Sequence, residues 1–498
     1  MGVTMHIEKK RLISDFSKSL ELNNAALFIG AGLSVSSGYF DWSNILKRPA
    51  KQLELDVEKE KHDLTLLAQF YENRNNRQSL NEILVDEFSR TFSITRNHEI
   101  IAKLPIQTVW TTNYDKLIEK AYENEGKKCD VKHEDNQLKS VKSDRDVVLY
   151  KMHGDIDHPN DLVITRDDYQ FFDKKHELFR EVLEADLVTK TFLFLGFSFS
   201  DPNLKSIIGK LRILLENKPR NHYCIFKKVS KDECEQRGFD YEYENRKQEY
   251  FVDDLRRFGI LVCLIDDYSE ITEILDEIET INRRKTIFVS GSAVDYSPFT
   301  NENAIYFIQT LSRKISENRS NYKIINGFGK GIGEFIINGV TLSNLETKKR
   351  KIHDSLTILP FPTYEKEKSK KKKIYEQYRS EMIQKSGISL YLFGNKYESQ
   401  KSKNFVNSTG MIEEFNLAIQ YKSLPLPIKI TGGSSNEIFG ILEKGNFDFK
   451  DNKFYEEALD TISNLDDLDI NKRKDIDTLI KRIINAINLL SKLESEDD

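Results

Sequence analysis

The stretch Ala25–Gly38, AALFIGAGLSVSSG, carries the first strong signal of the fold. Its opening five residues, Ala25–Ile29, form an apolar run that is too short for a helix, and this predicts a buried strand. The run ends at Gly30-Ala31-Gly32, where small residues let a ligand approach the backbone and free N–H groups can face phosphate. A Gly-Ala-Gly sequence alone is equally typical of a plain tight turn. The prediction of a nucleotide site therefore depends on similar breaks further along the chain.

Such breaks recur over the first 265 residues. Apolar runs at Ile106–Trp110, Val147–Met152 and Thr191–Leu195 end in TTNYD, HGD and GFSFSDP, and further runs are found at His222–Phe226 and Gly259–Ile265. Because helical patterns separate these runs, they predict a parallel sheet with helices on both faces. Ligands bind beyond the carboxyl ends of the strands in such sheets, so the loops are expected to meet at one edge.

Composition excludes several classes of protein. A length of 498 residues predicts two or three domains, and a net charge of -5 with 31% charged residues gives no reason to expect a nucleic-acid or membrane partner. There is no apolar run near the roughly 20 residues of a membrane span, and the N-terminus lacks a signal-peptide core. The four cysteines, of which Cys224 and Cys263 are predicted to be buried thiols, form no C-x-x-C pair. We therefore expect a reduced, cytoplasmic protein without a zinc site or other metal.

The motifs GAGLS, TTNYD, KMHGD and GFSFSDPN, in this order over residues 25–265, resemble those of sirtuin-like NAD-binding domains. This resemblance implies that His153 is the catalytic histidine and that Asn113 and Asp115 face the nicotinamide ribose. It further implies NAD+ contacts to the pyrophosphate by Gly30, Ala31, Gly32 and Ser34, and on the adenosine side by Gly196, Ser198 and Asp201. Asp115 and Asp201 each precede a predicted helix, so either could instead be a helix cap.

The chain departs from protein-deacylating sirtuins, which carry two cysteine pairs that bind structural zinc. Because those pairs are missing here, NAD+ hydrolysis is favoured over deacylation, and a non-catalytic nucleotide-binding module is the second alternative. Nicotinamide is already a cationic leaving group, so the reaction needs a stabilised oxocarbenium-like ribose and an oriented hydroxyl or water. His153 can accept a proton near neutral pH, and the Asn113 amide can both donate and accept hydrogen bonds.

A domain boundary is predicted near the segment 282–285, NRRK, which gives domains 1–283 and 284–498. Apolar runs again alternate with polar loops, at Thr286–Val289, Tyr322–Ile325, Leu356–Leu359, Ile388–Phe393 and Pro427–Ile430. The fold class is therefore α/β, with two doubly wound parallel-sheet domains, both Rossmann-like. The sequence NGFGKGIG at residues 326–333 fits a phosphate cradle before a helix at 334–342, although a flexible surface turn is the alternative.

The second series resembles SLOG domains, which bind nucleotides. Its TGGSSNE segment lacks the glycine-threonine pair of the related phosphoribohydrolases, which favours a sensor over a second active site. The two domains in this order resemble the effectors of the bacterial Thoeris antiphage system. That resemblance implies that a TIR-domain partner makes a cyclic ADP-ribose isomer, that this isomer binds SLOG and switches on NAD+ destruction in abortive infection, and that several subunits assemble into a homo-oligomer, a tetramer or larger.

The residues that match the signal-binding positions of these effectors are Ser290, Gly291, Gly327, Gly329, Gly331, Gly333, Arg379, Lys396 and Glu414. Arg379 and Lys396 suit phosphates and Glu414 suits ribose hydroxyls, although each could equally take part in a surface ion pair. The basic run Lys366–Lys373 is predicted to be a solvated loop rather than a nucleic-acid contact. The last predicted helix, Asn471–Leu493, places isoleucines and leucines on one face, which predicts packing on the second domain or, alternatively, a subunit interface.

Overall fold

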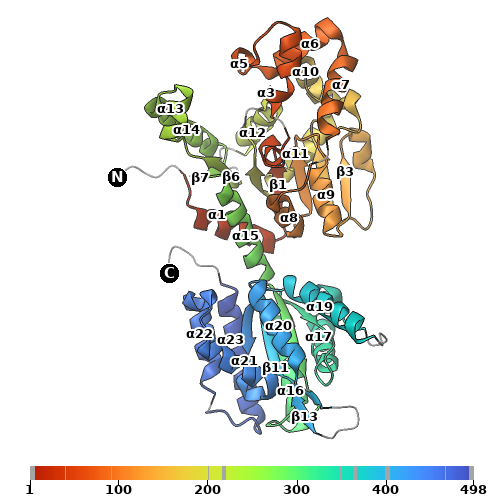
Figure 1. The fold of residues 1–498 in the computed structure, drawn as a ribbon, viewed down its shortest axis with the longest axis vertical. Coiled ribbons are helices and arrows are strands. Elements are labelled where there is room, and N and C mark those ends of the chain that lie inside the picture. The colour runs from red at the N-terminus through yellow and green to blue at the C-terminus, as the bar shows by residue number, and fades with distance from the viewer. Residues whose placement is uncertain are drawn as a thin grey trace. The chain divides into compact units, whose positions relative to one another are not determined.

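A computed structural model describes residues 6–492, except 40, 91, 200, 216–219, 348–349, 363–366, 399–403 and 466, and except the side chains of 368 and 451. The chain divides into two compact units, and the division falls between Glu279 and Thr280. Each unit is built around its own parallel sheet (Figure 1). Over the described ranges, no helix has the length and apolar character needed to cross a membrane.

The first unit contains a seven-stranded sheet in which every neighbouring pair is parallel. In spatial order its strands are β3 (Cys129–Lys132), β4 (Val147–Lys151), β2 (Thr108–Thr111), β1 (Ala25–Ile29), β5 (Thr191–Leu195), β6 (His222–Lys227) and β7 (Ile260–Ile265). The predicted doubly wound sheet is thus confirmed. The order reverses between β1 and β5, and open sheets of this kind bind ligands at such a reversal.

Helices cover both faces of this sheet (Figure 1). The helices of the unit are α1 (Lys9–Glu21), α2 (Ala31–Val35), α3 (Trp42–Ile45), α4 (Lys47–Gln52), α5 (Val57–Glu60), α6 (Leu64–Asn75), α7 (Arg77–Phe88), α8 (Arg96–Lys103), α9 (Leu117–Asn124), α10 (Arg166–Lys175), α11 (Glu177–Thr189), α12 (Pro202–Leu214), α13 (Lys231–Arg237), α14 (Tyr241–Arg257) and α15 (Ser269–Arg283). Phe28, Trp110 and Phe194 form one core with α11, α12 and α14. Cys224 and Cys263 are buried, as predicted.

Two parts of the first unit differ from the sequence prediction. The sequence pattern after the glycine loop predicts one helix over 39–60, whereas the structure has the three short helices α3, α4 and α5 there, which pack with α6 and α7 into a separate helical cluster. Strand β3 was not predicted, because its sequence CDVK has no apolar run. Its charges are nevertheless buried, since Lys132 Nζ lies 3.0 Å from Asp130 Oδ1.

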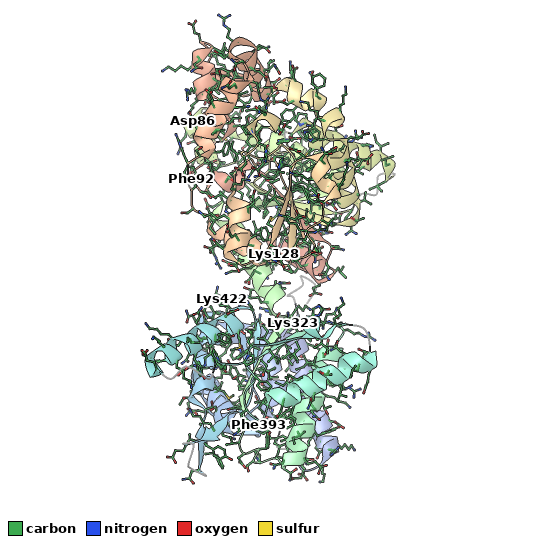
Figure 2. The ribbon with its side chains drawn as sticks, turned by 90° about the vertical axis from the view of Figure 1, so that its right-hand side faces the viewer. Asp86, Phe92, Lys128, Lys323, Phe393 and Lys422 are labelled. Atoms are coloured by element: carbon green, nitrogen blue, oxygen red, sulfur yellow. The ribbon has the colours of Figure 1, made fainter. Side chains whose placement is uncertain are left out.

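The second unit contains five parallel strands, in the order β10 (Leu356–Ile358), β9 (Lys323–Asn326), β8 (Thr286–Ser292), β11 (Ile388–Phe393) and β14 (Leu424–Pro427). Its order reverses between β8 and β11, so the doubly wound prediction is confirmed here as well. The antiparallel pair β12 (Asn395–Tyr397) and β13 (Phe405–Asn407) was not predicted. Phe393, labelled in Figure 2, ends β11 and is fully buried.

The helices of this unit are α16 (Asn301–Glu317), α17 (Gly333–Thr347), α18 (Ile352–Ser355), α19 (Lys368–Gln384), α20 (Thr409–Gln420), α21 (Gly433–Lys444), α22 (Lys453–Ser463) and α23 (Arg473–Leu490). The last of these, α23, packs into the core with α16 and α22, which confirms packing on the second domain. Alternate residues of β8 face this core and the α19–α20 side, as expected of a strand covered on both faces.

Three predictions about the second unit were wrong. The strand at 286–289 continues to Ser292, so Ser290 and Gly291 lie in β8 rather than in a loop. The strand placed at 427–430 is β14, at 424–427; Pro425 and Pro427 are tolerated because β14 is an edge strand. The basic run at 366–373 is helical from Lys368 onward, where α19 begins, although its described side chains remain largely exposed.

Candidate active site

Four neighbouring strands of the first unit, β4, β2, β1 and β5, end in the predicted site loops. The first group of side chains joins the β1 and β2 loops. Asn113 Nδ2 donates to Ser34 Oγ at 3.0 Å and to the Gly30 carbonyl at 3.2 Å. Ser34 Oγ in turn donates to Asp115 Oδ2 at 2.7 Å, while Asp115 Oδ1 accepts from the Leu117 N–H. Asp115 therefore binds the N–H of Leu117, the first residue of α9, and contacts the site loop at the same time.

Asn113 keeps one unused hydrogen-bonding atom. Its Oδ1 is buried and finds no partner among the described residues, while its Nδ2 is fully engaged. An unsatisfied buried amide oxygen is costly, so it favours a ligand or water that can donate a proton to it. A ribose hydroxyl or a water molecule has the required donor.

The β1 loop needs glycines mainly because it packs tightly against the β5 loop. A Cβ on Gly30 would lie 2.5 Å from the Gly196 carbonyl oxygen, and one on Gly196, where φ is +62°, would lie 2.4 Å from the Leu33 nitrogen. The Gly30 and Gly32 N–H groups donate to the carbonyls of Leu195 and Gly196. Within the described part of this loop, Ala31 N–H has no backbone acceptor, so Ala31 is the better placed of these amides to meet phosphate.

The second group joins the β4 and β5 loops. His153 Nε2 lies 3.0 Å from Asp201 Oδ2, and both side chains are almost fully buried. Asp201 Oδ1 also accepts from the Leu204 N–H at 2.8 Å, so Asp201 caps α12. Burial tends to raise the pKa of Asp201, but the nearby charge of His153 and the hydrogen bond from the Leu204 N–H outweigh burial and leave that pKa below its ordinary value. Ser198 in the same loop is exposed.

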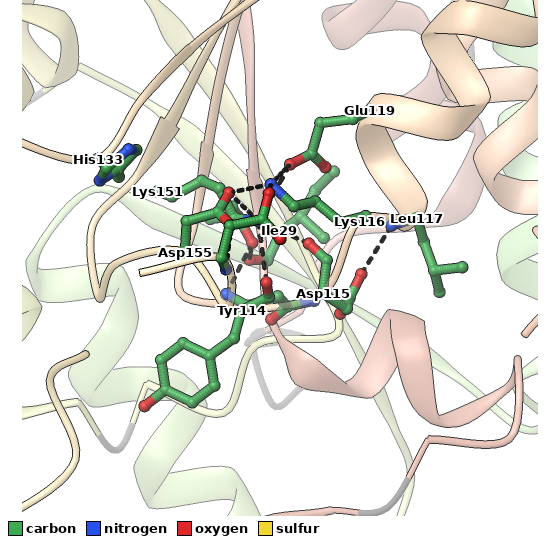
Figure 3. Close-up of polar contacts among 12 residues, drawn as sticks. Ile29, Tyr114, Asp115, Lys116, Leu117, Glu119, His133, Lys151 and Asp155 are labelled. Atoms are coloured by element: carbon green, nitrogen blue, oxygen red, sulfur yellow. Dashed lines mark hydrogen bonds and ion pairs between the residues drawn. The ribbon is translucent and has the colours of Figure 1, made fainter. Parts of the chain in front are cut away.

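A buried cluster of charges beneath these loops was missed by the sequence analysis. Lys151 is the last residue of β4, and its side chain has no exposed surface. Its Nζ donates to the carbonyls of Tyr114 and Asp115 at 3.0 and 2.6 Å and to Glu119 Oε1 at 3.0 Å (Figure 3). A lysine at the end of an apolar run gives no sign of burial, so only its place in KMHGD could have drawn attention to it.

One group of three residues in the described ranges brings metal-ligand atoms within 4.8 Å of one another, namely His133, Glu134 and His158. The two imidazole rings stack with centroids 4.4 Å apart and planes 23° from parallel. Two imidazoles that share an ion must each hold it in the plane of the ring, and stacked rings do not meet this condition. The group is therefore a poor metal site as it stands, and the absence of a metal stays a prediction.

The second unit has a cavity of about 140 Å³ at the carboxyl end of β8, where the strand order reverses. Of the predicted signal-binding residues, those that line the cavity are Ser290, Gly291, Gly327, Gly329, Arg379 and Glu414. Gly331, Gly333 and Lys396 are not among its lining residues, and Lys396 is exposed with its Nζ 3.2 Å from Thr409 Oγ1. Lining residues that the sequence did not single out include Asn326, Phe361 and Ser408.

Charged side chains meet inside this cavity. Glu414 accepts from Ser290 Oγ at 2.5 Å and from Arg379 Nε at 3.3 Å, and Arg379 also pairs with Glu413. Burial raises the pKa of the Glu414 carboxyl above its ordinary value, although Ser290 and Arg379 oppose this. The Arg379 guanidinium lies 5.4 Å from the centre of the Phe361 ring. A cation, a carboxyl group, a hydroxyl and an aromatic face thus surround one small space.

Comparison with known proteins agrees with this two-unit arrangement. Residues 107–252 match a family model described as a SIR2-like domain, and residues 270–490 match the Sir2- and TIR-associating SLOG family. The chain is 42% identical to the NAD(+) hydrolase ThsA of Enterococcus faecium, over 98% of this chain and 100% of the relative. The chain belongs to the ThsA family. It is also 43% identical to the ThsA of Bacillus cereus (strain MSX-D12), over 96% of this chain and 98% of the relative.

A more distant relative shares only part of this ThsA-family chain. The defense-associated sirtuin 2 of Bacillus subtilis is 25% identical over 288 residues, which are 54% of this chain and 28% of the relative. The similarity over nearly the full length to ThsA proteins therefore defines the family.

The contact between Asp201 and His153 leads to a pH-dependent prediction for this ThsA-family chain. Because the pKa of Asp201 is lowered in the folded state, its stabilising effect is fully present above the ordinary value of about 3.9 and is lost as the pH falls through the lowered value. Asp201→Asn keeps a good helix cap but removes the charge. We expect a lower melting temperature than the parent at pH 5–8 and a smaller difference below about pH 4. Thermal melts across this range test it, and a difference that does not change with pH would contradict it.

Proposed function

We propose that this protein hydrolyses NAD+ to ADP-ribose and nicotinamide, and that a cyclic ADP-ribose isomer bound in the second unit activates it. The observation that carries the proposal is that His153 and Asn113 follow neighbouring strands at one edge of the first sheet. His153 lies against Asp201, and Asn113 Oδ1 is buried without a hydrogen-bond partner among the described residues. Membership of the ThsA family, whose named relatives are NAD(+) hydrolases, supports the same activity.

The chemistry asked of these residues is cleavage of the bond between nicotinamide and ribose. The cationic nicotinamide leaves without a general acid, so the enzyme must stabilise an oxocarbenium-like ribose and direct a hydroxyl or water to its anomeric carbon. His153 accepts a proton from that hydroxyl or water, and Asp201 orients the imidazole. Asn113 Oδ1 accepts the second hydrogen bond that fixes the nucleophile.

The remaining contacts to NAD+ follow the sirtuin resemblance. Ala31 N–H and Ser34 face the pyrophosphate or ribose, and Gly30, Gly32 and Gly196 allow the β1 and β5 loops to pack closely enough to form the site. Ser198, which is exposed, contacts the adenosine side. NAD+ is the substrate, and no metal takes part.

In the second unit, Arg379 binds a phosphate of the activator and Glu414 binds its ribose hydroxyls. Lys396 and the glycine run, including Gly331 and Gly333, supply further contacts to the activator. A TIR-domain partner supplies the cyclic ADP-ribose isomer, and assembly into a homo-oligomer accompanies activation. The protein acts in the cytoplasm. Residues 1–283 form the NAD+-cleaving domain and residues 284–498 form the domain that binds the activator.

Two alternatives make different predictions for one experiment. The purified protein is incubated with NAD+ and an acetylated peptide, with and without each cyclic ADP-ribose isomer, and nicotinamide and deacetylated peptide are followed. Nicotinamide release without deacetylation supports hydrolysis. Deacetylation that depends on NAD+ supports a protein deacylase instead, and no turnover under any condition supports a non-catalytic nucleotide-binding module.

Asn113→Ala is expected to lower kcat for NAD+ cleavage by about 100-fold, because the nucleophile loses its orienting partner. The substitution also removes the hydrogen bonds to Gly30 and Ser34, so the melting temperature is measured beside the rate. A folded variant with a normal rate would reduce Asn113 to a structural turn residue.

A further inference from the structure

Lys151 lies two residues before His153 and makes an unusual set of contacts for a lysine. Its fully buried Nζ lies within 3.0 Å of four oxygen atoms. Two are the backbone carbonyls of Tyr114 and Asp115, and two are carboxylate oxygens of Glu119 and Asp155. A buried ammonium group normally occurs only with partners that satisfy its charge and its protons.

These four oxygens come from two different loops and one helix. Tyr114 and Asp115 directly follow Asn113 in the β2 loop, while Asp155 follows His153 in the β4 loop, and Glu119 lies on α9. Figure 3 shows the dashed contacts that converge on the Lys151 ammonium from these segments. One atom is therefore in direct contact with the loop of each proposed catalytic residue.

The cluster holds two lysines, Lys151 and Lys116, and three carboxylates, those of Glu119, Asp155 and Asp157. Lys116 Nζ lies 2.6 Å from Asp155 Oδ2 and 2.9 Å from Asp157 Oδ2, so Asp155 is shared by two lysines. Lys116 is 41% exposed and donates to neither backbone carbonyl. Buried ion pairs often add little net stability compared with apolar side chains of similar volume. A gain in stability is therefore a weak reason for burying the Lys151 ammonium, and its position between the two loops is the stronger one.

We infer that Lys151 is a positioning residue that holds the Asn113 loop and the His153 loop in fixed relation, so that both side chains meet the same ribose. This inference rests on the proposed NAD+ hydrolysis for its effect on rate. The physical reason is that a displacement of about 1 Å at a reacting group can cost about 100-fold in rate. Three directed hydrogen bonds and one ion pair from a single buried atom leave little room for such a displacement.

The test compares two full-length variants. The variant Lys151→Met/Glu119→Leu removes one positive and one negative charge together. It therefore loses the bonds of Lys151 to both loops without changing the net charge of the cluster. Lys127→Met is the matched control, because Lys127 Nζ likewise donates to two backbone carbonyls, those of Lys103 and Leu104, and these lie outside both loops. Both are assayed with NAD+ and the cyclic ADP-ribose isomer that best activates the parent, and amide hydrogen exchange is followed at residues 111–116 and 152–156.

We expect the double variant to lose about 100-fold in kcat while KM for NAD+ changes by less than about threefold, since binding contacts are kept and orientation is lost. Hydrogen exchange is expected to become faster in both loops and to stay unchanged in β1 and β5. Lys127→Met is expected to resemble the parent in rate and in the exchange of both loops. If the double variant does not fold, Lys151→Arg replaces it, because the larger guanidinium keeps the charge but cannot place its donors at the same point.

A normal kcat in the folded double variant, or faster exchange in only one of the two loops, would overturn the inference. Failure of the proposed function is distinguishable from this result. If the parent releases no nicotinamide under any condition, hydrolysis is wrong, and the exchange in the two loops alone decides whether Lys151 joins them.

Discussion

His153→Ala is expected to lower kcat for NAD+ cleavage by about 100- to 10,000-fold while the fold is retained, since that is the usual contribution of a general base. His153 is placed for this role by the end of β4 and by the Asp201 carboxylate 3.0 Å from its Nε2. Loss of the imidazole leaves the attacking hydroxyl or water without a proton acceptor. The measurement is nicotinamide release by the activated protein at saturating NAD+.

His158→Ala is the matched control for this prediction. His158 is exposed and follows His153 by five residues, but its ring stacks on His133 instead of meeting Asp201. We expect it to keep nearly the parent rate. A His153→Ala variant with unchanged melting temperature and near-normal turnover would remove His153 from the mechanism, whatever the control shows.

The second large effect is expected from Arg379→Ala, which should weaken binding of the activator by roughly 2–5 kcal/mol, or about 30-fold or more. The side chain of Arg379 is 13% exposed, lines the cavity of the second unit and is held against Glu414 and over the Phe361 ring. A guanidinium in this position offers two parallel donors to a phosphate. Calorimetric titration with a cyclic ADP-ribose isomer measures the loss directly.

Arg313→Ala provides the comparison for Arg379. Arg313 pairs with Glu317 and Glu346 and does not line the cavity, so its loss is expected to leave activator binding unchanged. Any NAD+ cleavage that occurs without activator should be equal in Arg379→Ala and the parent. An Arg379→Ala protein that binds and responds like the parent would place the phosphate site elsewhere.

Most strands of both sheets could be predicted because they are buried on both faces and therefore appear as continuous apolar runs. The predicted strand Ala25–Ile29 is β1 without any change, and Ile388–Phe393 is β11. Strand β3 could not be found in this way, since its buried Asp130 and Lys132 neutralise each other only in the folded protein. The start of β14 was missed because it contains prolines, which a strand accepts only at the edge of a sheet, and the sequence does not show that β14 is an edge strand.

The sequence was enough to predict which residues lie at the site, because they directly follow strands. It was not enough to predict which of their side chains contact one another. Strand order alone brings the Asn113 and His153 loops to one edge of the sheet. It does not show that Asp201 meets His153, or that the glycine N–H groups are partly occupied by β5 carbonyls. The role of Lys151 was hidden because burial of its ammonium depends on four oxygens from separate segments.

We propose that a nucleotide bound in the second unit controls NAD+ cleavage in the first. A ligand shifts such an equilibrium only if it binds the active arrangement more tightly than the resting one. The most direct test titrates the full-length protein with each cyclic ADP-ribose isomer and follows nicotinamide release from NAD+. We expect the rate of nicotinamide release to rise to a plateau with at least one isomer, over the concentrations at which calorimetry shows that isomer to bind. Constitutive cleavage by a protein that binds none of the isomers would contradict this proposal.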